Sequence, residues 1–363
     1  MKILHVDTEK GWRGGEQQLL YLIRGLRERG VECWVACRRG SEAEERFKRE
    51  GFRVIPLSGN QALDILKLGR AGKEFDLIHA HAAKAHTVSA LSKGLHRRPL
   101  IYTRRVDYPP RRNFLTALKY RLTDRVVAIS GAVKEVLRGA LGQIEVEVIP
   151  SAVDLKEVEA AVEPAKVKRI KEELQGSPLI GSLAALTEQK DIPNFILAAK
   201  EVLKAYPGAR FVVFGEGKLR GELQGVIERE GLKGKFILYG FVEDVPNYTK
   251  ALDLFVLPSR NEGLGSSLLI AMALKVPVVA TKVGGTVEAV KDGETGILVP
   301  PSNPKALGRA ILELLKDSGL RERLTKNAYA LVKERFTTGP MVNSYLNLYR
   351  EVLEGWRRSG APS

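Results

Sequence analysis

Residues 258–300 read PSRNEGLGSSLLIAMALKVPVVATKVGGTVEAVKDGETGILVP. The apolar run LDLFVLP at 252–258 leads into this stretch and stops at Pro258, a pattern typical of a buried parallel strand. SSLLIAMAL then predicts a helix, and PVVAT and GILVP predict two further short strands. Strands that alternate with helices indicate a doubly wound parallel sheet, so this stretch predicts the α/β class.

The loop between that strand and helix carries the residues most relevant to function. Glu262 follows the strand and can accept hydrogen bonds from sugar hydroxyls. Gly263 and Gly265 permit a tight turn, and Ser266 and Ser267 open the helix, where free backbone N–H groups attract a phosphate. The same residues also fit a capped helix with an exposed glutamate in any α/β protein, and the segment alone does not separate the two interpretations.

The whole chain reads as two α/β halves. We expect a first domain at 1–155, a linker with a helix at 156–177 and a second domain at 178–335. A last helix at 339–358, which contains Trp356, should pack back on the first domain. The predicted strands of the first half are MKILHVDT, ECWVAC, FRVIPL, DLIHAH, PLIYTRR, RVVAIS and EVEVIP, and those of the second are PLIGSLAAL, ARFVVFG, KFILYG, LDLFVLP, PVVAT and GILVP.

Composition points to a globular protein of a reducing compartment. Apolar residues make up 44% of the 363 residues, which is enough for two cores. The two cysteines, Cys33 and Cys37, fit neither a zinc ribbon nor a disulfide framework. The N-terminus enters a strand without a signal-like apolar region, and no stretch of about 18 apolar residues occurs. We therefore expect a cytoplasmic protein without a membrane span.

Positive charge is concentrated in residues 93–125. The net charge is +15, and about half of it lies in this segment, together with the apolar residues Phe114, Leu115, Leu118 and Leu122 at helical spacing. Such a helix can lie on an anionic membrane surface. The alternative is a helix with its leucines in the core and its cations in solvent. The cations are Lys93, Arg97, Arg98, Arg104, Arg105, Arg111, Arg112, Lys119, Arg121 and Arg125.

Further candidate residues follow other predicted strands. Gly14 and Gly15 come just after the first strand, where a glycine pair lets backbone N–H groups approach a ligand closely, although the spacing matches neither GxGxxG nor a Walker loop. Lys190 follows the first strand of the second half and is a candidate partner for a diphosphate. GEGKL, from Gly215, ends the next strand. A single lysine in a loop is, however, usually only solvated.

These motifs in this order resemble the family 4 glycosyltransferases. The resemblance rests on GWRGGEQQ, GSLAALTEQKD, VVFGEGK, LYGFVEDV, LDLFVLPSRNEGLGSSLLIAMALKVPVVAT and VGGTVEAVKDGETGILVPP, and is strongest over 178–335. It implies a GT-B fold, in which two Rossmann-like domains face a central cleft. It also implies transfer of a sugar from a nucleotide-diphosphate donor with retention at the anomeric carbon.

The resemblance assigns expected roles to matching positions. Glu262 matches the first carboxylate of the family's E-x7-E element, which contacts the donor sugar, and Lys190 matches the phosphate-binding lysine. Both are our candidate catalytic residues, together with Arg105 and Asp107 on the acceptor side. The candidate donor-binding residues are Gly14, Gly15, Gly215, Gly263, Gly265, Ser266 and Ser267.

Three positions depart from the family pattern. The second glutamate of E-x7-E is replaced by Ile270, which cannot accept hydrogen bonds from ribose hydroxyls. The usual arginine before the lysine is Ala185, and the usual histidine of the first domain is Arg105 in YTRRVDY. Nucleotide recognition must therefore differ from the usual pattern, or activity is lost. Arg104 is a further acceptor-side candidate.

No metal or other cofactor is expected. The sequence has no D-x-D, so Lys190 and a helix N-terminus would stabilise the leaving diphosphate. His79, His81 and His86 in DLIHAHAAKAH could form a metal site, but no third ligand at metal spacing accompanies the H-x-H pair, and polar residues bordering a cleft are the preferred interpretation.

Three classes of function remain open. The first is a transferase that extends a lipid-linked or envelope glycan at the inner face of the membrane, which residues 93–125 would contact. The second is an epimerase or hydrolase of a nucleotide sugar on the same scaffold. The third is a nucleic-acid-binding or DNA-modifying protein, which is disfavoured because no recognition motif accompanies the cations, so no nucleic acid is expected as a partner.

Overall fold

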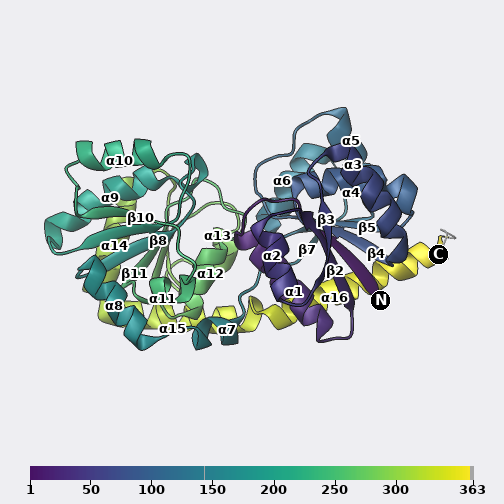
Figure 1. The fold of residues 1–363 in the computed structure, drawn as a ribbon. Helices are drawn as coiled ribbons and strands as arrows, with labels where there is room; N and C mark the ends of the chain where they lie inside the picture. The colour runs from purple at the N-terminus through teal and green to yellow at the C-terminus, as the bar shows by residue number, and fades with distance from the viewer. Residues whose placement is uncertain (143, 360–363) are drawn as a thin grey trace. The chain divides into compact units, whose positions relative to one another are not determined.

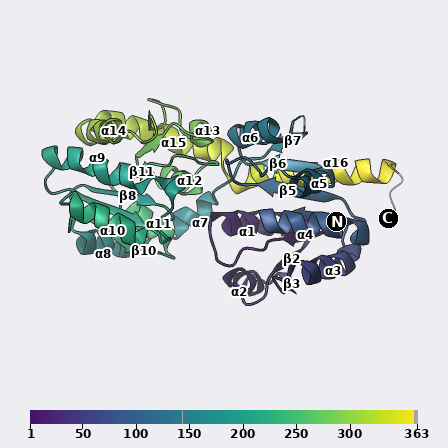
Figure 2. The ribbon, with the colours of Figure 1, turned by 90° about the horizontal axis from the view of Figure 1, so that it is seen from above.

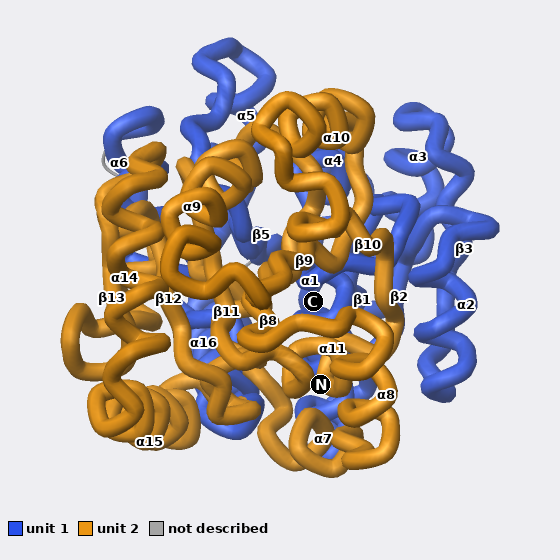
Figure 3. Tube along the Cα trace, turned by 90° about the vertical axis from the view of Figure 1, so that its left-hand side faces the viewer, with its two compact units in different colours: residues 1–152, 338–363 blue, residues 153–337 orange. Residues whose placement is uncertain are grey.

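The computed structural model describes residues 1–142 and 144–359 and divides into two compact units (Figure 3). Unit 1 comprises Met1–Ala152 and the C-terminal segment from Thr338, and unit 2 comprises Val153–Thr337. The chain thus passes from unit 1 into unit 2 and returns. The sequence predicted the corresponding boundaries at 155 and 335.

Unit 1 is built on a seven-stranded parallel sheet in the order β3-β2-β1-β4-β5-β6-β7 (Figure 1). Val6 of β1 pairs with Ala36 of β2 on one side and with Ala80 of β4 on the other. The strands β4 and β5 are buried throughout, as expected for a parallel sheet with helices on both faces. The strands are β1 (Lys2–Val6), β2 (Glu32–Arg38), β3 (Arg53–Leu57), β4 (Leu77–Ala80), β5 (Leu100–Arg104), β6 (Arg125–Ala128) and β7 (Val146–Val148).

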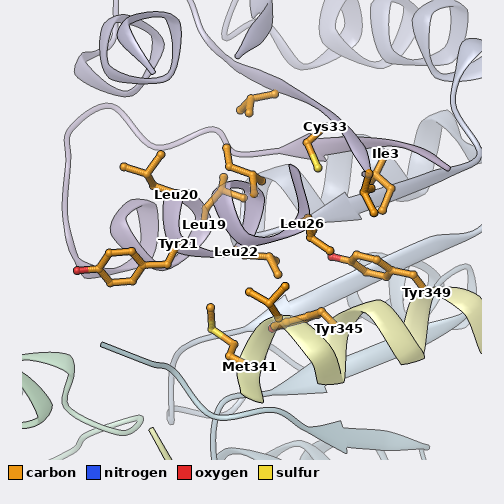
Figure 4. Close-up of a cluster of buried hydrophobic side chains, with 14 of the residues drawn as sticks. Ile3, Leu19, Leu20, Tyr21, Leu22, Leu26, Cys33, Met341, Tyr345 and Tyr349 are labelled. Atoms are coloured by element: carbon orange, nitrogen blue, oxygen red, sulfur yellow. The ribbon is translucent and has the colours of Figure 1, made fainter. Parts of the chain in front are cut away.

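The helices of unit 1 connect these strands, and the last one closes its core. Figure 4 shows Met341, Tyr345 and Tyr349 of the last helix, α16, beside Leu19 and Leu22 of the first helix, α1. These side chains are buried, so the apolar face of α16 completes the core of unit 1. The helices are α1 (Gly14–Arg27), α2 (Glu42–Arg49), α3 (Gln61–Ala71), α4 (Ala83–His96), α5 (Phe114–Arg121), α6 (Gly131–Leu141) and α16 (Thr338–Arg358), with a 3₁₀ turn at Gly72–Glu74.

Unit 2 is built on a six-stranded parallel sheet in the order β10-β9-β8-β11-β12-β13. Its core contains Phe195, Phe211 and Phe236, whose ring centroids lie 5.2–6.1 Å apart. The two parallel sheets confirm the predicted pair of doubly wound Rossmann-like units. The strands are β8 (Leu179–Leu183), β9 (Arg210–Phe214), β10 (Phe236–Gly240), β11 (Leu254–Leu257), β12 (Val278–Thr281) and β13 (Ile297–Val299).

The helices of unit 2 cover both faces of its sheet, and α9 and α14 pack side by side (Figure 2). The segment expected to be a linker with one helix contains two helices, α7 and α8, and belongs to unit 2. The helices are α7 (Leu155–Ala160), α8 (Pro164–Leu174), α9 (Ile192–Ala205), α10 (Arg220–Arg229), α11 (Val245–Lys250), α12 (Ser266–Ala273), α13 (Thr286–Ala289), α14 (Pro304–Lys316) and α15 (Ser318–Arg335), with a 3₁₀ turn at Glu188–Lys190.

The basic segment 93–125 does not form one continuous surface. Arg104 is buried, and Lys93 is paired with Asp124 at 2.6 Å, so neither is available to an external anion. In α5 the buried positions are Thr116 and Tyr120, whereas Phe114 is 82% exposed. The apolar stripe predicted from helical spacing therefore points largely to solvent at its N-terminal end.

No helix in the described part of the chain combines the length and the apolar character that crossing a bilayer requires.

Candidate active site

Three loops meet at the carboxyl edge of the unit 2 sheet, following β8, β9 and β11. Gly215, directly after β9, has a φ of +148° and lies so close to the loop after β8 that a Cβ would be 2.1 Å from the carbonyl oxygen of Ala184. Only glycine permits both that backbone conformation and that approach. The predicted residue Gly215 therefore holds two of these loops together.

Lys190 and Glu262 form an ion pair at this edge. Lys190 Nζ lies 2.5 Å from Glu262 Oε2, and the two side chains are 19% and 10% exposed. The Ser259 hydroxyl donates a second hydrogen bond to Glu262 Oε2 at 3.1 Å. Lys190 comes from the 3₁₀ turn after β8, and Glu262 comes from the loop after β11. Two residues 72 positions apart, both predicted for this site, are thus in direct contact.

The loop that carries Glu262 is shaped by glycines. Gly265 has a φ of +87° and forms the N-cap of α12, so the helix that begins at Ser266 and Ser267 has no side-chain cap on its first turn. Gly263 packs against Gly285, where a Cβ would lie 2.0 Å from the carbonyl oxygen of Gly263. The free N–H groups of this turn are the type of group that binds phosphate oxygens.

Asp191, which sequence reasoning missed, fixes the position of Lys190. It is 2% exposed, accepts a 2.8 Å hydrogen bond from the Ser302 hydroxyl and pairs with Arg260 at 3.0 Å. The N–H of Arg260 also donates to the carbonyl oxygen of Gln189 at 2.8 Å. These contacts tie the Lys190 turn to the Glu262 loop. The sequence signal was an aspartate before the Ile-Pro start of a helix, a common capping position.

Two of the three departures from the family pattern lie on the same elements of unit 2 as the candidate site residues. Ala185 is half-buried in the loop after β8, and Ile270 is half-buried in the second turn of α12. Neither is a core position.

The carboxyl edge of the unit 1 sheet brings together other predicted residues. Gly14 and Gly15 open α1, and a Cβ at Gly15 would lie 3.7 Å from Cδ of Arg105. Arg105 Nη2 lies 3.4 Å from Nδ1 of His81, which follows β4. Asp107 is half-buried farther along the loop after β5. Gly15, His81 and Arg105 therefore form one group at this edge.

Arg104, in contrast to Arg105, is buried and bound to the neighbouring backbone. Its side chain is 4% exposed and donates to the carbonyl oxygen of Tyr108, so it fixes the loop that follows β5. The sequence could not show this, because adjacent residues of a strand point to opposite faces and both neighbours here are arginine.

Two buried carboxyl groups, which sequence reasoning also missed, interact with each other near this edge, and one of them, Asp7, also interacts with Arg105. Burial raises the pKa of Asp7 to about 6, although the Arg105 charge and the N–H of Glu9 oppose the rise. Burial and then the negative charge of Asp7 raise the pKa of Glu16 to about 7. Two neighbouring carboxyl groups with raised pKa values are typical of functional sites, although structural networks also produce them.

Three histidines form a buried cluster beneath this edge. His5 Nδ1 lies 3.1 Å from His81 Nε2, and one ring nitrogen from each of His5, His79 and His81 falls within 4.8 Å of the others. His79 Nδ1 is 2.7 Å from the Tyr349 hydroxyl, and its Nε2 is 2.8 Å from the Thr103 hydroxyl. Burial lowers the pKa of all three, so they are neutral at pH 7. A metal would have to displace a hydroxyl partner of His79.

His86 lies apart from this cluster. Its ring stacks on Tyr102 with centroids 3.9 Å apart, and its Nε2 is 2.8 Å from the Thr123 hydroxyl. In the sequence no third ligand at metal spacing accompanies the H-x-H pair; the structure brings His5, and not His86, to that pair, because β1 and β4 are adjacent in the sheet.

Comparison with known proteins reveals similarity along nearly the whole chain. The family model "Glycosyltransferase Family 4" matches residues 12–157, and "Glycosyl transferases group 1" matches residues 165–331. A lipopolysaccharide core biosynthesis glycosyltransferase of Rhizobium meliloti, LpsE, is 26% identical over 96% of this chain and 98% of its own length. The alpha-D-kanosaminyltransferase of Streptomyces kanamyceticus is 32% identical over 49% of this chain and 47% of its own length.

Solved structures agree on the fold. The structure of Anabaena Alr3699/HepE in complex with UDP-glucose superimposes with a TM-score of 0.86 at 24% identity, covering 98% of this chain and all of that one. A glycosyltransferase from Rickettsia africae superimposes with a TM-score of 0.82 at 21% identity, covering 97% of this chain and 98% of that one. With both units matched by models of the same kind of enzyme, the chain belongs to the family 4 glycosyltransferases and has their GT-B fold.

Proposed function

We propose that this glycosyltransferase uses a nucleotide-diphosphate sugar and that Lys190 and Glu262 bind it. The observation that carries the proposal is their direct contact at 2.5 Å beside the uncapped start of α12. Lys190 would leave Glu262 to bind the diphosphate, and Glu262 would then accept hydrogen bonds from the sugar hydroxyls. The UDP-glucose complex of HepE, a protein of the same fold, supports this class of donor.

The proposed chemistry follows from the charges at this edge. Cleavage of the anomeric bond places negative charge on the diphosphate, and a fixed cation and a helix N-terminus stabilise that charge where it develops. Lys190 and the first turn of α12 supply both. We therefore propose metal-independent transfer, and we propose retention because the family resemblance implies it. Glu262 is assigned to donor positioning and not to nucleophilic attack.

The acceptor is proposed to bind at the carboxyl edge of unit 1, where Arg105 is grouped with Gly15 and His81. An envelope or lipid-linked glycan is the proposed acceptor class. LpsE of Rhizobium meliloti, named for lipopolysaccharide core biosynthesis, supports this class. So does an Escherichia coli galactosyltransferase named for a diphosphoundecaprenol-linked sugar, which is 24% identical over 77% of this chain.

The segment around α5 is the proposed membrane contact, and the cytoplasmic face the proposed location. Tyr108, Phe114 and Leu115 are 53%, 82% and 43% exposed, and Arg111 and Arg112 lie between them in the chain. Exposed aromatic and apolar side chains among cations are typical of surfaces that bind anionic lipids. Flotation with anionic vesicles should weaken for Phe114→Ser and not for Leu63→Ser, a change at a 57% exposed leucine of α3. Equal flotation of both variants would contradict this contact.

A nucleotide screen tests the donor site. UDP, GDP, ADP, CMP and their sugar conjugates should be compared by thermal shift, because a bound ligand raises the apparent stability. One base should give a selective shift that Lys190→Gln and Glu262→Gln abolish and that the exposed-loop control Glu294→Gln retains. Absence of any shift would contradict the proposal.

Turnover distinguishes a transferase from the other enzymes of this scaffold. Glu262→Gln should lower turnover by about a hundredfold or more if it positions the donor for reaction, and EDTA should have no effect. The anomeric configuration of the product, read by NMR, tests retention. Release of free or isomerised sugar without an acceptor would instead identify a hydrolase or an epimerase.

A further inference from the structure

A polar cavity of about 350 Å³ lies at the carboxyl edge of the unit 1 sheet. Its walls come from the loop after β1, the end of β2 and the first turn of α4, strands and helices that the sheet order places next to one another. Its volume is in the range of small-molecule sites, about 300–1,000 Å³. The lining residues are Thr8, Glu9, Lys10, Gly11, Arg13, Glu16, Arg38 and Lys84.

Four cations and two acids, Glu9 and Glu16, line this cavity, and none of the four cations forms an ion pair with a carboxylate of the described residues. Among the ion pairs of the described residues, none engages Lys10, Arg13, Arg38 or Lys84, although many other lysines and arginines of the chain are paired. Cations gathered around a cavity repel one another unless anions lie between them, and Glu9 and Glu16 supply at most two negative charges against these four positive ones.

Two of these cations are held in place by neighbouring backbone. Lys84 Nζ donates to the carbonyl oxygen of Gly59 at 2.9 Å, and a Cβ at Gly59 would lie 3.2 Å from Cζ of Arg38. The loop between β3 and α3 thus supports both side chains. Preorganised cations lose less conformational entropy when they bind a ligand.

Two further groups of the cavity, a hydroxyl and a helix start, also favour an anion. The Thr8 hydroxyl is buried and has no hydrogen-bond partner among the described residues, so it can donate to a ligand. Helix α4 begins at this wall with Ala82 as its N-cap and no side-chain cap, which leaves its first N–H groups available. Of the two acids, Glu16 is partly protonated at neutral pH because burial raises its pKa to about 7.

We propose that this cavity binds a phosphate group of the acceptor, as a phosphomonoester or phosphodiester. This inference rests on the proposed function, because it assigns the acceptor to unit 1. It deepens that function by naming the acceptor as a phosphorylated sugar or lipid. The cavity is built entirely from unit 1 residues, whereas Lys190 and Glu262 belong to unit 2.

Binding to the full-length protein tests the proposal by calorimetry. The probes are inorganic phosphate, glucose 6-phosphate, glucose and UDP. Phosphate and glucose 6-phosphate should bind and glucose should not. Arg38→Gln and Lys84→Gln should each weaken both anions by roughly tenfold, since each removes a charge-assisted hydrogen bond. Arg39→Gln, which changes an exposed neighbour outside the cavity, should bind both anions as the unchanged protein does.

The source of the phosphate is distinguished with vesicles. If vesicles that contain phosphatidic acid compete with inorganic phosphate, and Lys84→Gln abolishes this competition, the natural phosphate group belongs to a lipid headgroup. If only glucose 6-phosphate competes, the natural ligand is a soluble sugar phosphate. Both results support the proposal.

Two results would overturn it. One is failure of the unchanged protein to bind either phosphate probe while UDP still binds, which would leave the proposed function intact. The other is equal weakening of UDP and phosphate in Arg38→Gln and Lys84→Gln, which would assign the cavity to the donor. Phosphate binding without UDP binding would instead support the cavity and count against the proposed donor site.

Discussion

Replacing Glu16 by glutamine should stabilise unit 1 in a pH-dependent way. Glu16 is 3% exposed, and its Oε2 accepts a 2.7 Å hydrogen bond from the N–H of Arg13. Glutamine retains a carbonyl oxygen for this bond and cannot ionise. The substitution therefore removes the buried negative charge with little change of shape.

The size of the effect follows from the pKa of Glu16. Its folded value is about 7 and its ordinary value is 4.5. Between these values the folded state keeps a proton that the unfolded chain has released, so the unfolding free energy falls as the pH rises through this window. A difference of about 2.5 units corresponds to an upper limit of about 3 kcal/mol at pH 8. Glu16→Gln should recover part of this energy above pH 7 and none below pH 4.5.

Tryptophan fluorescence provides the assay, because Trp12, Trp34 and Trp356 all belong to unit 1. Thermal unfolding at pH 8 should shift upward in Glu16→Gln by several degrees, since 1 kcal/mol corresponds to about 2–4 °C for a unit of this size. At pH 4.5 the two proteins should unfold at the same temperature. Glu28→Gln, at the exposed end of the same helix, is the control and should show no shift at either pH.

A lower unfolding temperature for Glu16→Gln at pH 8 would refute this reasoning. It would mean that nearby N–H groups and cations stabilise the carboxylate by more than burial disfavours it. An equal gain at both pH values would also refute it, because a packing effect does not depend on protonation.

Three further predictions concern other parts of the molecule. Gly285→Ala should impair turnover and lower stability, because its Cβ would lie 2.0 Å from the carbonyl oxygen of Gly263 in the Glu262 loop. The control Gly221→Ala, which lies in open space on α10, should be neutral or slightly stabilising in the same thermal melts and turnover assays. Phe195→Ala should destabilise unit 2 by about 3–5 kcal/mol in urea unfolding followed by circular dichroism, and a loss below about 1 kcal/mol would contradict the tight packing of its three-phenylalanine core. Burial lowers the pKa of His5 from 6.5 to about 3. Below pH 6.5 the unfolded chain therefore binds a proton at His5 that the folded chain does not, and the free energy of unfolding should fall as the pH drops. His5→Phe should make that fall shallower in urea titrations, and an unchanged slope would count against a neutral His5.

The sheets could be predicted from sequence because their strands are continuous apolar runs. LDLFVLP and DLIHAH contain the buried strands β11 and β4. The position of Glu262 at the carboxyl edge of the sheet could be predicted for the same reason, since it follows such a run. Its contact with Lys190 required the strand order, which places β8 beside β11.

The features that sequence reasoning missed depend on which residues face one another. Asp7 and Glu16 look like ordinary loop and helix acids, but the fold buries both and brings them close enough to interact. His5 joins His81 only because β1 pairs with β4. The basic segment 93–125 was counted as one surface, but a linear count cannot show that Arg104 points inward.

The return of the chain to unit 1 through α16 affects how the protein is made. Residues 153–337 are contiguous and can fold as soon as they leave the ribosome, whereas the core of unit 1 also requires Tyr345 and Tyr349 from the last helix. At about 5–20 residues per second, the ribosome needs roughly 10–40 s to proceed from the end of the first segment to α16. During this interval Leu19, Leu22 and Leu26 of α1 lack their partner, so the nascent N-terminal half is where chaperones should bind.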